Sequence, residues 1–185
     1  MRKLYFKSQT EYGIYGGNIC TPVCCIVASN YLLRENNRPI SNIFSSYHMD
    51  KIMKACHHMY SECFSQTGVN MMLSDVQRYF PPSLNLFEIA GMTRSGETES
   101  VEDLLVQPLC KLMELELKKN SCRVVIVTRL GHTVCYLMDG LGGVFLFDPL
   151  EASIKDVCGC WAQTIPSKNS EYSGLIVTKT AYVGR

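Results

Sequence analysis

The sequence predicts an α+β fold, because helical patterns fill roughly the first two thirds of its 185 residues and strand patterns fill the last third. Apolar residues recur at helical spacing in residues 22–34, 49–64 and 100–119. Runs rich in β-branched and aromatic residues predict strands over residues 123–128, 132–138, 143–147 and 174–177. We therefore expect an N-terminal helical lobe and a C-terminal antiparallel sheet within a single domain of residues 1–185.

The segments between these long elements have their own local signals. Residues 74–79 predict a short helix that the following proline pair ends, and residues 84–89 alternate like a strand. The polar residues 92–99 predict a loop, and the glycine-rich residues 139–143 predict a hairpin turn between two strands.

Composition limits the classes of partner. An apolar fraction of 46% is enough for a hydrophobic core, so we expect a folded chain, and we expect it to be a monomer. The formal net charge is +1 without runs of like charge, which argues against nucleic acid and against a membrane surface as partners. No apolar run approaches the length of a membrane span.

The ten cysteines indicate free thiols. Most of them lie inside apolar helix or strand patterns, where cysteine behaves as a small buried hydrophobic residue. The first seven residues are followed by polar residues and not by the apolar stretch of a signal peptide. We therefore expect an intracellular protein of the cytoplasm or nucleus.

Two groups of cysteine and histidine residues are candidate metal ligands. These are Cys56, His57, His58 and Cys63, and the pair Cys158 and Cys160. Neither group has the Cys-x-x-Cys spacing of structural zinc sites, and the first falls on an apolar helix face. We therefore expect no metal and no cofactor.

A cysteine at the start of the first helix is the candidate nucleophile. Cys20 follows two glycines, and we expect Thr21 to cap the helix and Pro22 to occupy its first position. The partial positive charge of a helix N-terminus lowers the pKa of a nearby thiol. Cys24 is the alternative nucleophile if the helix begins later, and a turn followed by a merely buried cysteine is the alternative without catalysis.

The candidate base and its orienting carboxylate lie on two neighbouring strands. His132 begins one strand after Gly131, and Asp148 ends the next. A turn between the strands places the two residues at about the same level, so the carboxylate can orient the imidazole towards a thiol. His48, His57 and His58 are the rival histidines, and Asp148 could instead serve only the turn that ends its strand.

An acyl-transfer site also needs hydrogen-bond donors for an oxyanion. Gln9 lies in a polar stretch before Cys20, and its side-chain amide could join the Cys20 backbone N–H. Asn18 is the second candidate, although it could instead belong to the turn before the helix.

This set of residues is typical of papain-like cysteine proteases, and its order resembles viral tegument-type deubiquitinases. That family comprises the N-terminal proteases of herpesvirus large tegument proteins and their relatives. The resemblance lies in Gln9, in residues 17–20, in Gly131-His132 and in residues 144–149. The herpesvirus enzymes carry their histidine just after the Asp-Pro pair, where this chain has Leu150. His132 precedes Asp148, which is the order of ordinary papain-like proteases.

The resemblance implies a papain-like fold that cleaves after the Gly-Gly end of ubiquitin or a ubiquitin-like modifier. Cys20 would attack, His132 would carry the proton, Asp148 would orient it, and Gln9 would hold the oxyanion. A general cysteine protease or acyltransferase, and a non-catalytic modifier-binding domain, are the alternatives. Aromatic side chains could form a channel that admits only glycine, and the candidates are Tyr12, Tyr15, Tyr136 and Trp161.

Overall fold

The computed structural model describes residues 6–34, 40–64, 84–91, 122–129, 131–139, 142–158 and 172–179. In this part of the chain, helices precede strands, which confirms the predicted α+β class. The helices are η1 (Gln9–Glu11), η2 (Gly16–Asn18), α1 (Cys20–Leu33), α2 (Ile40–Ile43) and α3 (Ser46–Cys63). The strands are β1 (Leu84–Gly91), β2 (Arg123–Arg129), β3 (His132–Met138), β4 (Val144–Asp148), β5 (Ser153–Asp156) and β6 (Tyr172–Lys179).

The strands form one antiparallel sheet in the order β1-β6-β2-β3-β4-β5. β2 and β3 pair along their whole length, from Arg123 opposite Met138 to Arg129 opposite His132. Gly131 between them has a φ of 77°, a left-handed conformation that glycine adopts without strain. The β3–β4 ladder is shorter and runs from Met138↔Val144 to Cys135↔Phe147, which leaves the start of β3 free on that side.

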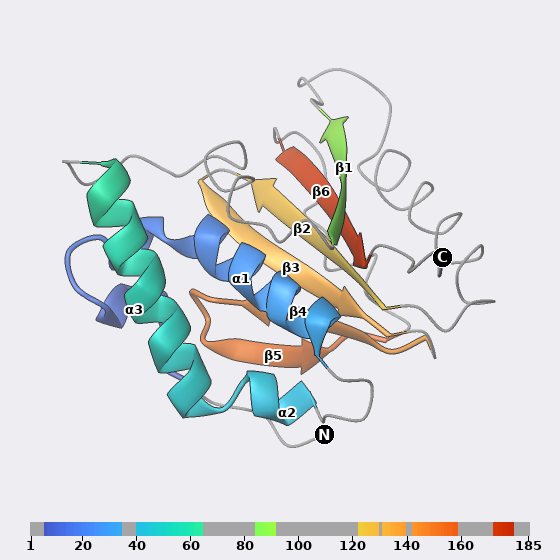
Figure 1. Cartoon of the computed structure of the whole chain (residues 1–185), viewed down its shortest axis with the longest axis horizontal. Coiled ribbons are helices and arrows are strands. Elements are labelled where there is room, and N and C mark those ends of the chain that lie inside the picture. Colours follow the sequence, from blue (N-terminus) through green and yellow to red (C-terminus); the bar gives the residue numbers. More distant parts are fainter. Residues whose placement is uncertain are drawn as a thin grey trace, which may run out of the picture.

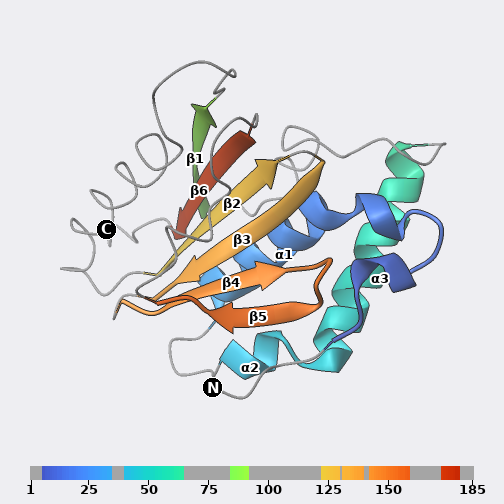
Figure 2. The same cartoon turned by 180° about the vertical axis from the view of Figure 1, so that it is seen from behind.

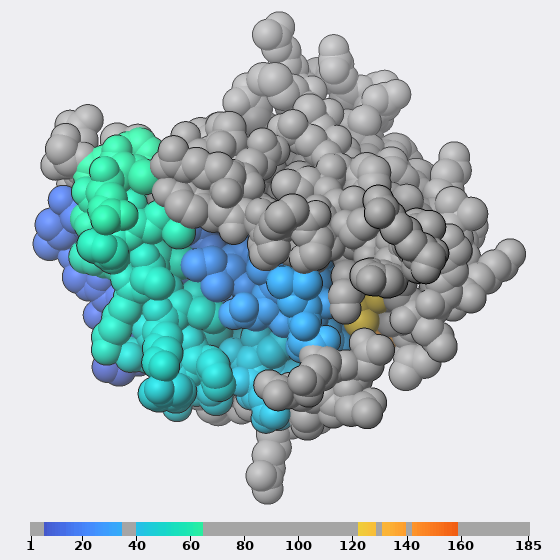
Figure 3. Space-filling model, viewed as in Figure 1, coloured from blue at the N-terminus to red at the C-terminus, as the bar shows by residue number. Residues whose placement is uncertain are grey.

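The helices cover one face of this sheet. α1 lies across β3 and β2, and α3 packs beside α1 on the same side of the sheet (Figures 1 and 2). The space-filling view shows α3 on the outer surface, with part of α1 visible next to it (Figure 3). Helix and strand side chains join in one hydrophobic cluster, so the predicted helical lobe and the sheet share a single core.

The burial of α1 explains why its apolar residues are not confined to one face. It is enclosed by the sheet on one side and by α3 on the other, so ten of its fourteen residues are buried. α3 has an ordinary amphipathic pattern, because only one of its faces meets the core. No helix in the described ranges is both long and apolar enough to cross a membrane.

Some element boundaries differ from the sequence predictions. α1 begins two residues earlier than expected, and α3 begins three residues earlier, where the Ser45 hydroxyl accepts the His48 N–H at 3.3 Å. α2 and β5 were not predicted, because four residues are too few to show a periodicity. The expected helices at 74–79 and 100–119 and the expected loop at 92–99 lie outside the described residues.

Candidate active site

Cys20 is the first residue of α1. The helix starts at Cys20 because the Val23 N–H donates to the Ile19 carbonyl at 3.1 Å, so Ile19 is the N-cap. The expected cap at Thr21 is therefore wrong, and Pro22 occupies the third helical position. A proline fits there because the first turn has no intrahelical acceptor for its N–H groups. The backbone N–H of Cys20 belongs to the same unpaired set, which makes it a candidate oxyanion donor.

The glycines before Cys20 allow a close approach between two segments. A Cβ on Gly16 would lie 2.3 Å from the backbone oxygen of Gln9, whereas a Cβ on Gly17 would meet nothing within 4 Å. Gly16 is therefore required by the packing of η2 against η1. The consequence is that Gln9 lies beside the segment that leads into Cys20.

His132 and Asp148 form a direct hydrogen bond between neighbouring strands. Continuation of the β3–β4 register places Asp148 opposite Val134, two residues from His132, so the pair meets diagonally and not at one level. The imidazole Nε2 lies 2.9 Å from Asp148 Oδ1. The same oxygen accepts the N–H groups of Leu150 at 2.8 Å and Glu151 at 3.2 Å, which fixes the carboxylate within its turn.

Cys20 meets the other side of this imidazole. The start of α1 and the start of β3 lie at the same end of the sheet (Figure 1), and the side chains of Cys20 and His132 each shift the pKa of the other. Since Nε2 is taken by Asp148, Nδ1 is the ring nitrogen left for the sulfur. The sulfur also lies 3.9 Å from the Gly131 carbonyl oxygen. The structure therefore brings together the three residues that the sequence singled out.

The pKa shifts of the three groups favour a thiolate–imidazolium pair. The hydrogen bond to Asp148 and then that to Cys20 raise the pKa of His132 from 6.5 to about 9. Burial opposes ionisation of Cys20, but the hydrogen bond and charge of His132 outweigh it and lower the thiol pKa. Burial likewise opposes ionisation of Asp148, and the His132 contact and two backbone N–H groups lower its pKa.

Cys20 is buried although it is the candidate nucleophile. Its relative exposure is 2%, because the sulfur lies against the backbone at the start of β3. The side chain of His132 is 30% exposed and is the more accessible member of the pair.

Cys24 lies one helical turn further along α1, where its side chain is fully buried. It has no exposed surface, and its sulfur donates to the Thr133 carbonyl at 3.4 Å. Burial raises the pKa of Cys24 well above the ordinary thiol value. These surroundings keep the Cys24 thiol protonated and favour Cys20 as the nucleophile.

Gln9 is held between the segment before Cys20 and the turn after Asp148. Its side-chain Nε2 donates to the Gly17 carbonyl at 3.2 Å, and its backbone N–H donates to the Pro149 carbonyl at 3.0 Å. An amide nitrogen carries two hydrogens, so one remains for an oxyanion. Asn18 ends η2, where its N–H donates to the Tyr15 carbonyl at 2.9 Å.

Sequence reasoning missed a group of threonines next to the site. Thr133 directly follows His132 and is fully buried. Its hydroxyl oxygen also lies 2.8 Å from that of Thr21 and 2.9 Å from that of Thr128. The available signal was the pair Thr128 and Thr133 inside an otherwise apolar strand hairpin, since buried polar groups require partners.

The predicted aromatic channel is not formed by the described tyrosines. Tyr136 is buried at 1% exposure, and the Tyr15 ring packs on Tyr60 with centroids 5.1 Å apart. Burial, and then the charge of Asp50, raise the pKa of Tyr12 to about 12. Trp161 lies outside the described residues.

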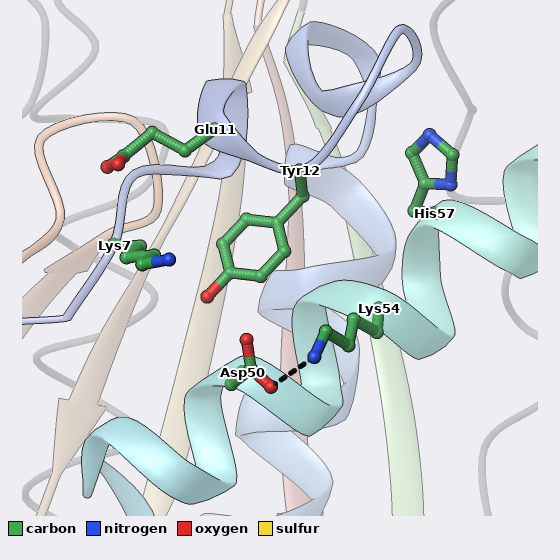
Figure 4. Close-up of a pocket in the computed structure, with 6 residues that line it drawn as sticks. All are labelled: Lys7, Glu11, Tyr12, Asp50, Lys54 and His57. Atoms are coloured by element: carbon green, nitrogen blue, oxygen red, sulfur yellow. Dashed lines mark ion pairs between the residues drawn. The ribbon is translucent and has the colours of Figure 1, made fainter.

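Tyr12 instead points into a hollow between η1 and α3 (Figure 4). Asp50 lies at its centre and pairs with Lys54 at 2.7 Å. Its volume is about 330 Å³, and its lining residues are Lys7, Glu11, Tyr12, Asp50, Lys54 and His57. Both positive and negative side chains line this hollow, so they do not indicate whether a ligand would be an anion or a cation.

The rival histidines on α3 have partners of their own. His48 Nδ1 lies 2.7 Å from the Ser45 hydroxyl, His57 accepts the Tyr15 N–H at 3.4 Å, and His58 lies 3.2 Å from Glu62. Within the described ranges, no group of three or more histidine, cysteine or acidic residues could hold a metal ion. Cys160 lies outside those ranges, so the pair with Cys158 is not covered by that finding.

Comparison with known proteins gives a likeness in fold. No protein-family model matches this sequence, and no curated protein matches it. A similar solved structure is the ubiquitin-specific protease encoded by murine cytomegalovirus tegument protein M48, in complex with a ubiquitin-based suicide substrate. The TM-score is 0.57 at 14% identity, over 99% of this chain and 89% of that chain. The chain therefore shares the fold of this viral protease.

Proposed function

We propose that this chain is a papain-like thiol deubiquitinase that cleaves after the C-terminal Gly-Gly of ubiquitin or a ubiquitin-like modifier. One observation carries the proposal: at a helix N-terminus the Cys20 sulfur lies 3.9 Å from the carbonyl oxygen of Gly131, the residue before His132, and His132 hydrogen-bonds to Asp148. This is the arrangement that a cysteine nucleophile requires, and it occurs in a chain with the fold of a viral ubiquitin-specific protease.

The proposed reaction has two steps. The Cys20 thiolate attacks the carbonyl carbon of the C-terminal glycine, and the His132 imidazolium gives its proton to the departing amine as the isopeptide C–N bond breaks. His132 then takes a proton from water, which attacks the thioester and releases the carboxylate and the Cys20 thiol. The Cys20 N–H and the free hydrogen of the Gln9 amide stabilise the oxyanion in both steps.

Two further observations support the proposed substrate class and cellular compartment. The similar viral protease was crystallised with a ubiquitin-based substrate, which supports ubiquitin as the substrate class. The five buried cysteines of the described ranges are free thiols, which supports action in a reducing compartment, and we propose the cytoplasm or nucleus.

A ubiquitin probe with a C-terminal electrophile tests the proposal. We expect a covalent adduct with the wild-type protein and with Cys24→Ala, and none with Cys20→Ala. Reaction with small thiol reagents alone would favour a general cysteine protease or acyltransferase. A non-covalent complex without any adduct would favour a modifier-binding domain. Either of these results contradicts the proposed deubiquitinase.

A further inference from the structure

The first two residues of α1 contact the residues on both sides of His132 in the sequence. The Cys20 sulfur lies 3.9 Å from the Gly131 carbonyl oxygen, and the Thr21 hydroxyl oxygen lies 2.8 Å from that of Thr133. The candidate nucleophile therefore directly precedes one member of the Thr21–Thr133 contact, and the candidate base directly precedes the other.

The Thr21–Thr133 contact is a buried polar bond between α1 and β3. Thr21 is 2% exposed and Thr133 is fully buried. The Thr21 side chain is available for this bond because the N-cap of α1 is Ile19. One turn later the Cys24 thiol, a weaker donor, reaches the Thr133 carbonyl at 3.4 Å. A buried hydroxyl without a partner is costly, so the start of α1 cannot slide along β3 without losing a bond.

A second hydroxyl ties Thr133 to the sheet. Thr128 of β2 lies directly opposite Thr133 in the β2–β3 ladder, and their hydroxyl oxygens are 2.9 Å apart. A hydroxyl has one proton to donate and two lone pairs that accept, so Thr133 can bond to Thr21 and Thr128 at once. The Thr133 side chain is therefore fixed within the hairpin, and Thr21 is the member of the group that connects it to α1.

We propose that Thr21 is a positioning residue: its hydroxyl, held by Thr133, fixes the start of α1 against the start of β3 and so keeps Cys20 in register with His132. The inference rests on the proposed function in taking Cys20 as the nucleophile and His132 as the base. Thr21 acts only through the distance and angle between thiol and imidazole, on which proton transfer depends. A hydroxyl pair that only stabilised the fold would lower the melting temperature without slowing the reaction of the folded protein.

Two matched variants separate these roles. Valine has nearly the shape of threonine without its hydroxyl. Thr21→Val removes the bond between α1 and β3 and leaves Thr133 bonded to Thr128, whereas Thr128→Val removes the bond within the hairpin and leaves Thr133 bonded to Thr21. Neither variant leaves the Thr133 hydroxyl without a partner, and only Thr21→Val releases the start of α1. Thr21→Ser restores the hydroxyl.

The first measurement is the cleavage of a ubiquitin substrate with a fluorogenic C-terminal amide, at a temperature where melting curves show every variant to be folded. We expect Thr21→Val to lower kcat about tenfold with KM unchanged, because a small displacement of the thiol from the imidazole slows the chemical step. We expect Thr21→Ser to recover most of this loss and Thr128→Val to keep the wild-type kcat. Thr21→Val combined with Thr133→Val is no slower than Thr133→Val alone, since that change already removes the contact.

The second measurement is the rate of Cys20 alkylation by iodoacetamide at pH 7, which does not depend on the substrate. A thiol held beside an imidazole is more ionised and reacts faster. We expect slower alkylation of Cys20 in Thr21→Val and an unchanged rate in Thr128→Val, followed by tandem mass spectrometry of the Cys20 peptide. The exposed Cys63 and Cys158 serve as internal references.

The outcomes separate this inference from the proposed function. A wild-type kcat in Thr21→Val, or equal losses in Thr21→Val and Thr128→Val, overturns the positioning role and leaves Cys20 as the nucleophile. A wild-type protein that is alkylated at Cys20 but does not cleave the ubiquitin substrate contradicts the proposed function, and the alkylation rates then decide the positioning role. A wild-type Cys20 that does not react contradicts both. If Thr21→Val does not fold, Thr21→Ala removes the same hydroxyl with less bulk, and the same loss of kcat is expected.

Discussion

Cys20 and Cys24 are the same chemical group one turn apart on the same helix, yet their surroundings differ in every respect that matters for a nucleophile. Cys20 lies in the first turn of α1, where its sulfur is 3.9 Å from the carbonyl oxygen of Gly131, the residue before His132. Cys24 lies in the helix interior, where its partner is a backbone carbonyl and where it has no exposed surface. The pKa of Cys20 is lowered and that of Cys24 is raised well above its ordinary value.

The difference teaches that burial alone does not decide the reactivity of these thiols. Burial raises the pKa of both, and Cys20 is 2% exposed while Cys24 is fully buried. What separates them is the supply of hydrogen-bond donors and positive charge, which only the helix start and the imidazole provide. The difference in reactivity between Cys20 and Cys24 can therefore be tested by removing the nucleophile, the imidazole or the hydrogen-bond donors in turn.

Removal of the two thiols in turn has the largest expected effect. Cys20→Ala lowers turnover by roughly 10⁴-fold or more, because no other group can form the thioester. Cys24→Ala keeps turnover near the wild-type value. Each change removes one buried sulfur atom and costs about 1 kcal/mol of folding free energy, which thermal melting checks. Retained turnover in Cys20→Ala with loss in Cys24→Ala would reverse the assignment.

Replacement of the His132 imidazole or of the Asp148 carboxylate has the next largest expected effect on turnover. We expect His132→Ala to be as damaging as Cys20→Ala, because thiol and imidazole act as one unit. We expect the loss of turnover in Asp148→Asn to be about 10²-fold smaller than in His132→Ala, since Asp148→Asn changes the orientation of the imidazole and does not remove the proton carrier. The amide oxygen of asparagine can still accept the Leu150 N–H, so the turn is kept. Wild-type activity in His132→Ala would remove the proposed triad.

Gln9 tests whether the oxyanion donors lie at the Cys20 end of α1. Gln9→Ala is expected to lower kcat by about 10²-fold with little change in KM, because the donor acts on charge that develops in the transition state. Thr10→Ala is the control, as Thr10 is an exposed neighbour in the same short helix. A change confined to KM would assign Gln9 to substrate binding instead.

The pH dependence of kcat/KM tests the ionisation of Cys20 and His132 in the unmodified protein. The acid limb of kcat/KM marks ionisation of the Cys20 thiol below its ordinary range, and the alkaline limb near pH 9 marks loss of the His132 proton. Because the pKa of His132 is raised from 6.5 to about 9, its stabilising contribution is complete below pH 6.5 and is lost as pH rises through about 9. The difference in melting temperature between wild type and His132→Ala therefore narrows between pH 7 and pH 10. A constant difference would contradict the ion pair.

Metal removal has the smallest expected effect. A metal bound only to the folded state would stabilise it, so chelation would lower the melting temperature. We expect a chelator to leave the melting temperature and the turnover unchanged, since the cysteines are assigned to thiol chemistry and to the core. Stoichiometric zinc in the purified protein would instead assign ligand roles to Cys56, His57, His58 and Cys63, or to Cys158 and Cys160.

The features that sequence could predict are those set by local pattern. The predicted and observed bounds of β3 agree residue for residue, because Gly131 precedes the strand and the largely apolar run of residues 134–138 ends at Asp139. The meeting of His132 and Asp148 follows from the hairpin between their strands, although the pair is offset by two residues along the ladder. The start of α1 was ambiguous because proline is tolerated at any position of a first helical turn.

The features that sequence could not predict depend on tertiary packing. Nothing in the residues around Cys20 indicates that the sulfur is covered by the backbone of Gly131, more than a hundred positions away. The threonine network joins three elements, and no local pattern links Thr21 to Thr133. Tyr12 and Tyr15, which were expected near the site, pack elsewhere, because the segment of η1 and η2 directs them towards α3.

The most direct test of the central claim is to locate the adduct formed with a ubiquitin-based electrophile. The wild-type protein is treated with the probe at pH 7, digested, and mapped by tandem mass spectrometry across the peptide that contains both Cys20 and Cys24. We predict that the whole modification lies on Cys20. A modification on Cys24, or its persistence in Cys20→Ala, would contradict the account.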